Sequence, residues 1–408
     1  MQPDAAARAA QPRQLLVDLS VLVHQDDQTG VQRLVRRILQ ALRAAPPPGF
    51  RVVPVYDAGS CYAYASGGED GGVPRPAAGA DALQPLQVRA GDIFLGLDLC
   101  PDHVPGKRAV FDDLRRHGVA VYFVVYDLLP VTMPTMFSAG ASPWFARWLD
   151  TVAGSADGLL CISRAVADQL LDWLEQHPAT NRGPLRIGHF HPGADLDEAP
   201  GATAPLSGEE QALLDKLQGS PALLMVGTLE PRKMHAEALD AFELLWHGAG
   251  EADAAAPVLV IVGKQGWMTE QLAERLAQHH EQGKRLFWLR HASDAMLLAL
   301  YRHSSALLAA SSGEGFGLPL VEAARHGLPL IVRDIPVFRE VCGSHAAYFS
   351  GGSAELAAAL QDWLALRAAG RAPASAGMPY LSWAASAADL LRIVMQQHWY
   401  KTATTLLP

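Results

Sequence analysis

Two glutamates flank a glycine-rich turn in the second half of the sequence. Glu314 lies in the run SSGEGFGLPLVEAARHG, and Glu322 follows it eight positions later. A carboxylate at either position can accept hydrogen bonds from hydroxyl groups. We expect Glu322 to bind the hydroxyl pair of a ribose, and Glu314, nearer the loop tip, to hold hydroxyls of a transferred sugar. Solvated glutamates on a helix surface are the alternative that the spacing leaves open.

The turn between the two glutamates predicts an anion site. Its glycines leave the backbone unobstructed, and Pro319 suits the first turn of a helix, where its missing N–H costs nothing. Backbone N–H groups at such a helix start point outward and bind anions such as phosphate. The N–H groups in question belong to Gly315, Phe316, Gly317 and Leu318.

Two neighbouring cations supply a second part of the predicted site. Arg232 and Lys233 lie in the segment VGTLEPRKMHAEALDAF, just after an apolar run that ends at Gly227. Cations at the end of a buried strand can neutralise a diphosphate and the charge that develops on a leaving nucleoside diphosphate. A pair of solvated surface cations is the alternative.

The elements around these residues indicate an α/β fold. Short runs rich in Val, Ile and Leu alternate with amphipathic stretches, which is typical of buried parallel strands joined by helices. In open parallel sheets, ligands bind beyond the carboxyl ends of the strands. Strands are expected at residues 15–22, 51–56, 92–98, 119–127, 158–163, 185–190, 221–227, 258–263, 285–290, 305–311, 329–334 and 346–350.

The length and the changes in composition predict two domains. The first spans residues 15–200 after a disordered lead-in of residues 1–14, and the second spans residues 221–380. Residues 201–220, rich in Gly, Ala, Pro and Glu, are expected to form the hinge. Residues 381–408 carry a striped helix that can cross back to the first domain.

Composition excludes several classes of protein. Half of the 408 residues are apolar and 18% are charged, as in ordinary folded enzymes, and the net charge of -9 argues against a nucleic-acid partner. The four cysteines lie far apart, which argues against a disulfide framework or a zinc site. No transmembrane helix and no signal peptide are expected, although peripheral membrane contact stays open.

The glutamate run resembles the Glu-x7-Glu signature of glycosyltransferase family 4. The segment with Arg232 and Lys233 is similar to the family's Glu-Pro-Arg-Lys-Asn motif, with Met234 at the Asn position. The resemblance implies the GT-B fold, with two Rossmann-like domains, and places Glu314 at the donor sugar and Glu322 at the ribose.

Three further residues of the second half join the nucleotide site through this resemblance. Gly263 and Lys264, in VGKQGW, lie in the region that approaches the nucleotide in these enzymes, and Arg290 follows the next strand, where the base usually passes. Simple exposure is the alternative for Lys264.

In the first half the resemblance implies contacts with the donor and the acceptor. Gly30 and Val31, in DDQTGVQRLVRRIL, lie at a helix start that can approach the donor phosphates. Tyr126 and Asp127 end an apolar strand where relatives carry His-Asp, and Ser163 lies at a strand-to-helix turn. Asp127 and Ser163 can instead cap the turn and the helix that follow them.

The resemblance as a whole implies a retaining hexosyltransferase of surface-polysaccharide or lipopolysaccharide O-antigen assembly. The expected donor is a nucleoside-diphosphate sugar, with GDP-mannose favoured, and the acceptor is a glycan or a lipid-linked saccharide. Arg232, Lys233, Glu314 and Asp127 form the expected catalytic set, without metal ion or other cofactor. The expected location is the cytoplasm or the inner face of the membrane. A nucleotide-sugar epimerase and a non-catalytic sugar- or nucleotide-binding protein are the alternatives.

Overall fold

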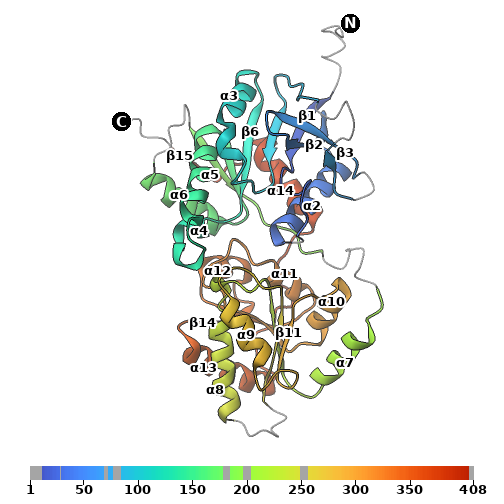
Figure 1. Ribbon diagram of the computed structural model, residues 1–408, viewed down its shortest axis with the longest axis vertical. Coiled ribbons are helices and arrows are strands. Elements are labelled where there is room, and N and C mark those ends of the chain that lie inside the picture. Colours follow the sequence, from blue (N-terminus) through green and yellow to red (C-terminus); the bar gives the residue numbers. More distant parts are fainter. Residues whose placement is uncertain are drawn as a thin grey trace. The chain divides into compact units, whose positions relative to one another are not determined.

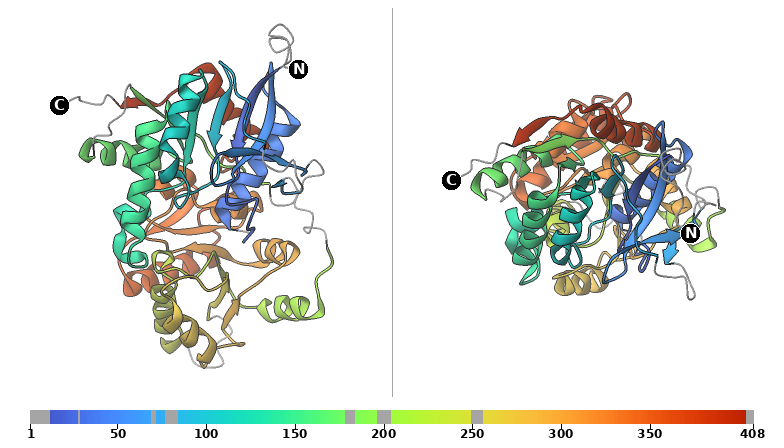
Figure 2. Two further views of the ribbon diagram at one scale, coloured as in Figure 1. Left: turned by 45° about the horizontal axis from the view of Figure 1, so that its top comes forward. Right: turned by 90° about the horizontal axis from the view of Figure 1, so that it is seen from above.

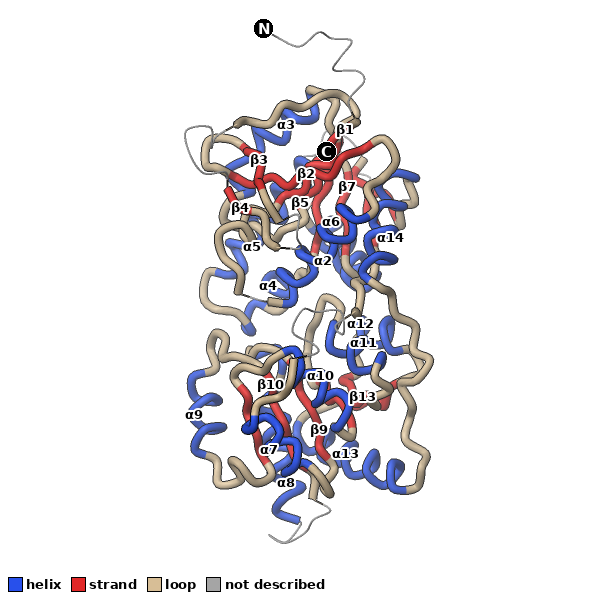
Figure 3. Tube along the Cα trace, turned by 90° about the vertical axis from the view of Figure 1, so that its right-hand side faces the viewer, coloured by secondary structure: helices blue, strands red, loops and turns tan. Residues whose placement is uncertain are grey.

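A computed structural model of the chain describes residues 12–27, 29–68, 72–76, 84–177, 184–195, 204–248 and 256–403. The chain divides into two units, each built around its own sheet (Figures 1 and 2). Unit 1 comprises Met1–Val131, Gly140–Gly193 and Leu381–Pro408, and unit 2 comprises Thr132–Ala139 and Ala194–Tyr380. In both units the strands lie inside and the helices outside (Figure 3).

The sheet of unit 1 has the strand order β15-β8-β7-β6-β5-β1-β2-β3-β4. The strands from β8 to β2 are parallel, and their apolar side chains are almost all buried because helices cover both faces. The parallel strands are β1 (Arg13–Asp18), β2 (Phe50–Asp57), β5 (Ile93–Gly96), β6 (Ala120–Val125), β7 (Gly158–Cys161) and β8 (Leu185–His189).

The edges of this sheet differ from the sequence prediction. β3 (Tyr62–Ser66) pairs antiparallel with β2, β4 (Arg75–Pro76) follows it, and β15 (Lys401–Ala403) pairs antiparallel with β8. None of these three was expected. β4 and β15 are short and lack the continuous apolar run that marks a parallel strand buried on both faces, and β3 is a short run of Tyr and Ala without Val, Ile or Leu.

A capping box and an amphipathic stripe explain the first described helix of unit 1. α2 (Gly30–Ala44) starts with a capping box between Thr29 and Gln32, and its buried apolar side chains repeat with helical spacing. α14 (Trp383–Gln396) packs beside α2. The other helices are α3 (Arg108–Arg116), α4 (Leu129–Thr132), α5 (Ala141–Ser155) and α6 (Arg164–Gln176), with 3-10 turns η1 (Val104–Lys107) and, in unit 2, η2 (Pro134–Met136).

The sheet of unit 2 is parallel throughout its described strands, in the order β11-β10-β9-β12-β13-β14. The run Val258–Val262 of β10 is buried at every position, as expected for a strand covered on both faces. The remaining strands are β9 (Ala222–Val226), β11 (Leu286–Leu289), β12 (Ala306–Ala309), β13 (Leu330–Arg333) and β14 (Ala346–Phe349). The expected strands of both halves are thus present, with ends that differ by a few residues.

Helices α8 and α13 pack against each other and share an apolar core with this sheet. Their bounds are His235–Gly248 and Ser353–Ala368. The others are η3 (Pro231–Lys233), α7 (Gly208–Leu217), α9 (Glu270–Gln278), α10 (Asp294–His303), α11 (Leu318–Arg325) and α12 (Pro336–Cys342).

Two expectations about the connecting segments need correction. The lead-in was expected to run to residue 14, but β1 begins at Arg13, and Gln14 is buried with its N–H bonded to Asp92 Oδ1 at 2.7 Å. Residues 1–11 lie outside the described part of the chain. The expected hinge at 201–220 contains α7, whose capping box joins Ser207 and Glu210.

The end of the chain returns to the first unit, since α14 and β15 both belong to unit 1. Among the described residues, no helix combines the length and the apolar character that crossing a bilayer requires.

Candidate active site

The predicted cations and the first glutamate meet at one edge of the sheet of unit 2. Arg232 and Lys233 lie on η3, which follows β9, and Glu314 lies on the loop between β12 and α11. β9 and β12 are parallel neighbours, with Leu224 opposite Leu307. Their carboxyl ends therefore reach the same edge, where ligands bind in open α/β sheets.

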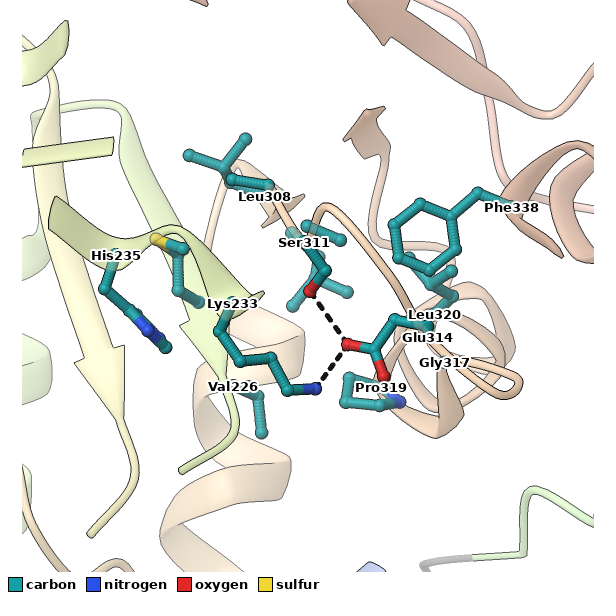
Figure 4. Close-up of a pocket in the computed structure, with 14 residues that line it drawn as sticks. Val226, Lys233, His235, Leu308, Ser311, Glu314, Gly317, Pro319, Leu320 and Phe338 are labelled. Carbon is teal, nitrogen blue, oxygen red and sulfur yellow. Dashed lines mark hydrogen bonds and ion pairs between the residues drawn. The ribbon is translucent and has the colours of Figure 1, made fainter. Parts of the chain in front are cut away.

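Glu314 is bonded to both cations. Its Oε2 lies 2.9 Å from Arg232 Nη1, and its Oε1 lies 2.5 Å from Lys233 Nζ. Ser311 Oγ donates to the same Oε1 at 2.8 Å (Figure 4). On its other side, Arg232 Nη2 lies 2.9 Å from Glu230 Oε2. Two cations and two carboxylates thus form one ion cluster, which we call the cation cluster.

The cation cluster is largely shielded from water. Its four side chains are only 10–15% exposed, so these pairs are screened less than surface ion pairs. Burial by itself would raise the pKa of Glu314, but Lys233 and Arg232 more than offset this and lower the pKa to about 2. Glu314 is therefore ionised at every pH at which the protein would work.

His235 lines the same pocket as Lys233, Ser311 and Glu314 (Figure 4). Its side chain is buried, and Nδ1 has no hydrogen-bond partner among the described residues. Burial, helped by the charge of Lys233, lowers the pKa of His235 to about 3. The imidazole is therefore neutral and adds no positive charge to the site.

Two glycines allow the backbone to pack closely beneath the cluster. A Cβ on Gly263 would lie 1.9 Å from the carbonyl oxygen of Gly227, so no side chain fits there. Gly227 has φ +143°, and the end of Lys233 lies 3.4 Å from the position of its missing Cβ. A side chain at Gly227 would thus have a strained backbone conformation, with its Cβ in van der Waals contact with the end of Lys233.

The turn predicted to bind an anion leads into a helix as expected. Gly317 adopts φ +94° and caps α11, Pro319 lies in its first turn, and the side chain of Phe316 is buried. Gly317 and Pro319 line the pocket beside Glu314 (Figure 4). Gly315 is buried and Leu318 begins the helix.

The structure does not bring Glu322 into this pocket. Its side chain is 3% exposed on α11 and accepts a hydrogen bond from the Tyr301 hydroxyl at 2.8 Å. This contact holds the carboxylate in the core between α10 and α11. If Glu322 contacts a ribose in this arrangement, its carboxylate must accept hydrogen bonds from both the Tyr301 hydroxyl and the ribose hydroxyls.

The other predicted nucleotide residues of unit 2 lie on neighbouring strand ends. Lys264 is exposed on the loop after β10, where its carbonyl accepts the N–H of Leu229 at 2.9 Å. Arg290 is exposed after β11, with its guanidinium 4.4 Å from the centre of the Trp288 ring. Both follow strands of the same sheet edge as the cation cluster.

The predicted residues of unit 1 are engaged in local structure. Gly30 begins α2, with Val31 in its first turn. The buried hydroxyl of Tyr126 donates to the carbonyl of Leu97 at 2.6 Å.

Asp127 and Ser163 form the capping hydrogen bonds that were the alternative to an acceptor contact. Asp127 Oδ1 accepts the N–H of Leu129 at 3.0 Å, and Ser163 Oγ accepts the N–H of Val166 at 3.2 Å.

Three residues of the pocket and the cation cluster were missed in the sequence. Glu230 lies in the same Glu-Pro-Arg-Lys run and could have been noticed as a second carboxylate. Ser311 directly precedes the glycine-rich turn. His235 has no sequence signal, because a lone histidine at a helix start is commonplace.

These two Rossmann-like units define a GT-B fold, the architecture of many glycosyltransferases. The chain resembles sucrose-phosphate synthase from Thermosynechococcus elongatus, with TM-score 0.62 and 15% identity over 94% of this chain and 99% of that one. It also resembles HepE from Anabaena, solved with UDP and glucose, with TM-score 0.58 and 13% identity over 93% and 95% of the two chains.

Sequence comparison points to the same class. Residues 209–376 match the family model described as "Glycosyl transferases group 1". The chain is 42% identical over 387 residues to the serotype-specific mannosyltransferase WbdA of Escherichia coli, which covers 93% of this chain and 46% of WbdA. A 123-residue segment is 33% identical to O-antigen chain mannosyltransferase B of Escherichia coli, covering 29% of this chain and 30% of that protein. The chain thus spans about half the length of WbdA.

Proposed function

We propose that this chain is a retaining glycosyltransferase that transfers a hexose, with mannose favoured, from a nucleoside-diphosphate sugar to a glycan or lipid-linked saccharide. The observation that carries the proposal is the cation cluster at the carboxyl ends of β9 and β12. The name of WbdA, a mannosyltransferase, supports mannose as the sugar, and GDP-mannose as its donor remains our inference.

The donor diphosphate would bind at Arg232 and Lys233 and at the start of α11. Arg232 offers a planar fork of donors, and Lys233 offers a compact ammonium group. The N–H groups of Gly315 to Leu318 would complete the site. Glu314 would then accept hydrogen bonds from hydroxyls of the sugar, which keeps the sugar beside its leaving group.

In the proposed reaction the acceptor hydroxyl attacks the anomeric carbon from the face that the diphosphate leaves. The bond to the diphosphate breaks as the new glycosidic bond forms, and a phosphate oxygen takes the proton of the acceptor. Arg232 and Lys233 stabilise the negative charge on the departing nucleoside diphosphate. This route needs no enzymic nucleophile and no metal ion.

The proposal also covers the acceptor and the cellular location of the reaction. The acceptor would be a growing surface polysaccharide such as an O-antigen, handled in the cytoplasm or at the inner face of the membrane. Asp127, Tyr126 and Ser163 are proposed to lie on the acceptor side, although their present hydrogen bonds serve the local fold.

Incubation of the chain with nucleotide sugars, with and without a saccharide acceptor, tests the proposal. The expected result is release of nucleoside diphosphate together with a lengthened acceptor, and dependence of the release on that acceptor. Conversion of the donor to an epimer without acceptor would contradict transfer and identify an epimerase. Binding without any turnover would instead identify a non-catalytic binding protein.

A further inference from the structure

The cation cluster is internally neutralised. Arg232 and Lys233 carry two positive charges, and Glu230 and Glu314 carry two negative charges at hydrogen-bonding distance. Arg232 also donates to the carbonyl of Gly313 at 3.1 Å. The groups that a diphosphate would bind therefore already bind carboxylates.

Glu314 occupies the same donor atoms that phosphate oxygens would need. Its two carboxylate oxygens are shared between Arg232 Nη1 and Lys233 Nζ, and Ser311 holds the carboxylate in this position. A diphosphate and the Glu314 carboxylate are both anions, so they compete for the two cations and repel each other when both are near them.

Apart from Lys233, the basic side chain among the described residues that line this pocket is that of His235. His235 lines the pocket next to Lys233, but burial lowers its pKa to about 3 and keeps it neutral. Glu314 itself, with a pKa of about 2, does not escape by protonation. The carboxylate must therefore find new hydrogen-bond donors when a diphosphate takes its place.

A sugar-bearing donor provides such partners, and a bare nucleoside diphosphate does not. Hydroxyl groups donate to carboxylates, so a hexose held beside the diphosphate can bind the displaced Glu314. After transfer the sugar is gone, and only the anionic diphosphate remains next to the carboxylate. Return of Glu314 to the cations then favours release of the product.

We infer that Glu314 is a specificity-determining residue that lets the site distinguish the intact sugar donor from its nucleoside-diphosphate product by competing with the diphosphate for Arg232 and Lys233. This inference rests on the proposed function, because it concerns the donor site of that reaction. The inference predicts that a variant without the Glu314 charge binds the nucleoside-diphosphate product more tightly than the native protein does.

The test compares dissociation constants of the full chain for a nucleoside diphosphate and for the matching nucleotide sugar by isothermal titration calorimetry. GDP with GDP-mannose, UDP with UDP-glucose and dTDP with dTDP-glucose are offered to the unmodified chain, and the pair that binds is used. Glu314→Gln keeps the size of the side chain and removes the competing charge.

Glu314→Gln is expected to bind the diphosphate about tenfold more tightly, while affinity for the sugar donor does not rise in parallel. The control Glu274→Gln makes the same charge change on an exposed face of α9 and should leave both constants unchanged. Weaker or unchanged diphosphate binding by Glu314→Gln would overturn the inference and leave the proposed function standing. If the unmodified chain binds none of these ligands, the proposed function and the inference both fail.

Ser311→Ala covers the case in which Glu314→Gln does not fold. This variant removes the hydroxyl that holds Glu314 on the cations and changes no charge. Diphosphate binding should tighten in the same direction by up to about tenfold, because the lost hydrogen bond joins a hydroxyl to an ionised carboxylate. Unchanged or weaker binding in Ser311→Ala would also overturn the inference.

Discussion

Replacing Lys233 with Met removes one charge and keeps the length of the side chain. The ammonium lies 2.5 Å from Glu314 Oε1 and is 15% exposed, so it is well placed for a charge-assisted contact with a phosphate. Such a contact contributes about 1.5–3 kcal/mol, or roughly 10–150-fold in affinity. Because Lys233 must first release Glu314, we expect a loss near the lower end, about tenfold.

Isothermal titration with the nucleoside diphosphate measures this loss, and steady-state kinetics should show turnover falling with it. Lys284→Met is the matched control, since Lys284 is exposed just before β11, at the opposite end of the sheet from the cation cluster. Folding is checked by the thermal unfolding midpoint. A folded Lys233→Met protein that binds diphosphate as well as the control would remove Lys233 from the site.

Three further predictions concern the ribose, the metal and the pH. Glu322→Gln should lower donor affinity by about 1–3 kcal/mol in total, and much less for a 2′,3′-dideoxyribose analogue; full additivity of the two losses by calorimetry would contradict a ribose contact. Transfer should persist in EDTA, whereas loss of activity that Mn²⁺ or Mg²⁺ restores would refute metal independence. Burial raises the pKa of Asp18 from 3.8 to about 7, so the contribution of Asp18 to the free energy of unfolding should fall as pH rises from about 4 to 7. Asp18→Asn should reduce this fall and be more stable than the native chain in denaturant at pH 8; lower stability there would refute the argument.

The interior of the fold was predictable from the sequence because parallel strands leave a strong local signal. Val258–Val262 is apolar and buried at every position, and such a run is typical of a strand covered by helices on both faces. The edge strands gave no such signal. Lys401–Ala403 is polar and mostly exposed, and it becomes a strand only through antiparallel pairing with β8.

The missed helix at Gly208–Leu217 shows a different failure. Its capping box at Ser207 and Glu210 was readable in the sequence, but the surrounding Gly, Ala and Pro residues favoured a linker interpretation. The linker interpretation followed the composition of the whole segment, whereas the capping box correctly indicated a helix.

For the candidate site, the sequence predicted which residues lie close together, but it did not predict which of them form ion pairs. Arg232, Lys233 and Glu314 follow strand ends, and parallel neighbours bring such residues together. That Glu314 occupies both cations depends on side-chain geometry, which spacing does not encode. The burial of Glu322 against Tyr301 likewise depends on how α10 and α11 pack.

The stereochemistry of transfer tests the central claim most directly. The chain is incubated with GDP-mannose and a mannose-terminated saccharide, and the anomeric configuration of the product is followed by proton NMR from the first turnover. We predict a lengthened acceptor whose new linkage keeps the α configuration of the donor, with GDP released in equal amount. A β-linked product, or donor consumption without a lengthened acceptor, would contradict the claim that this chain is a retaining glycosyltransferase.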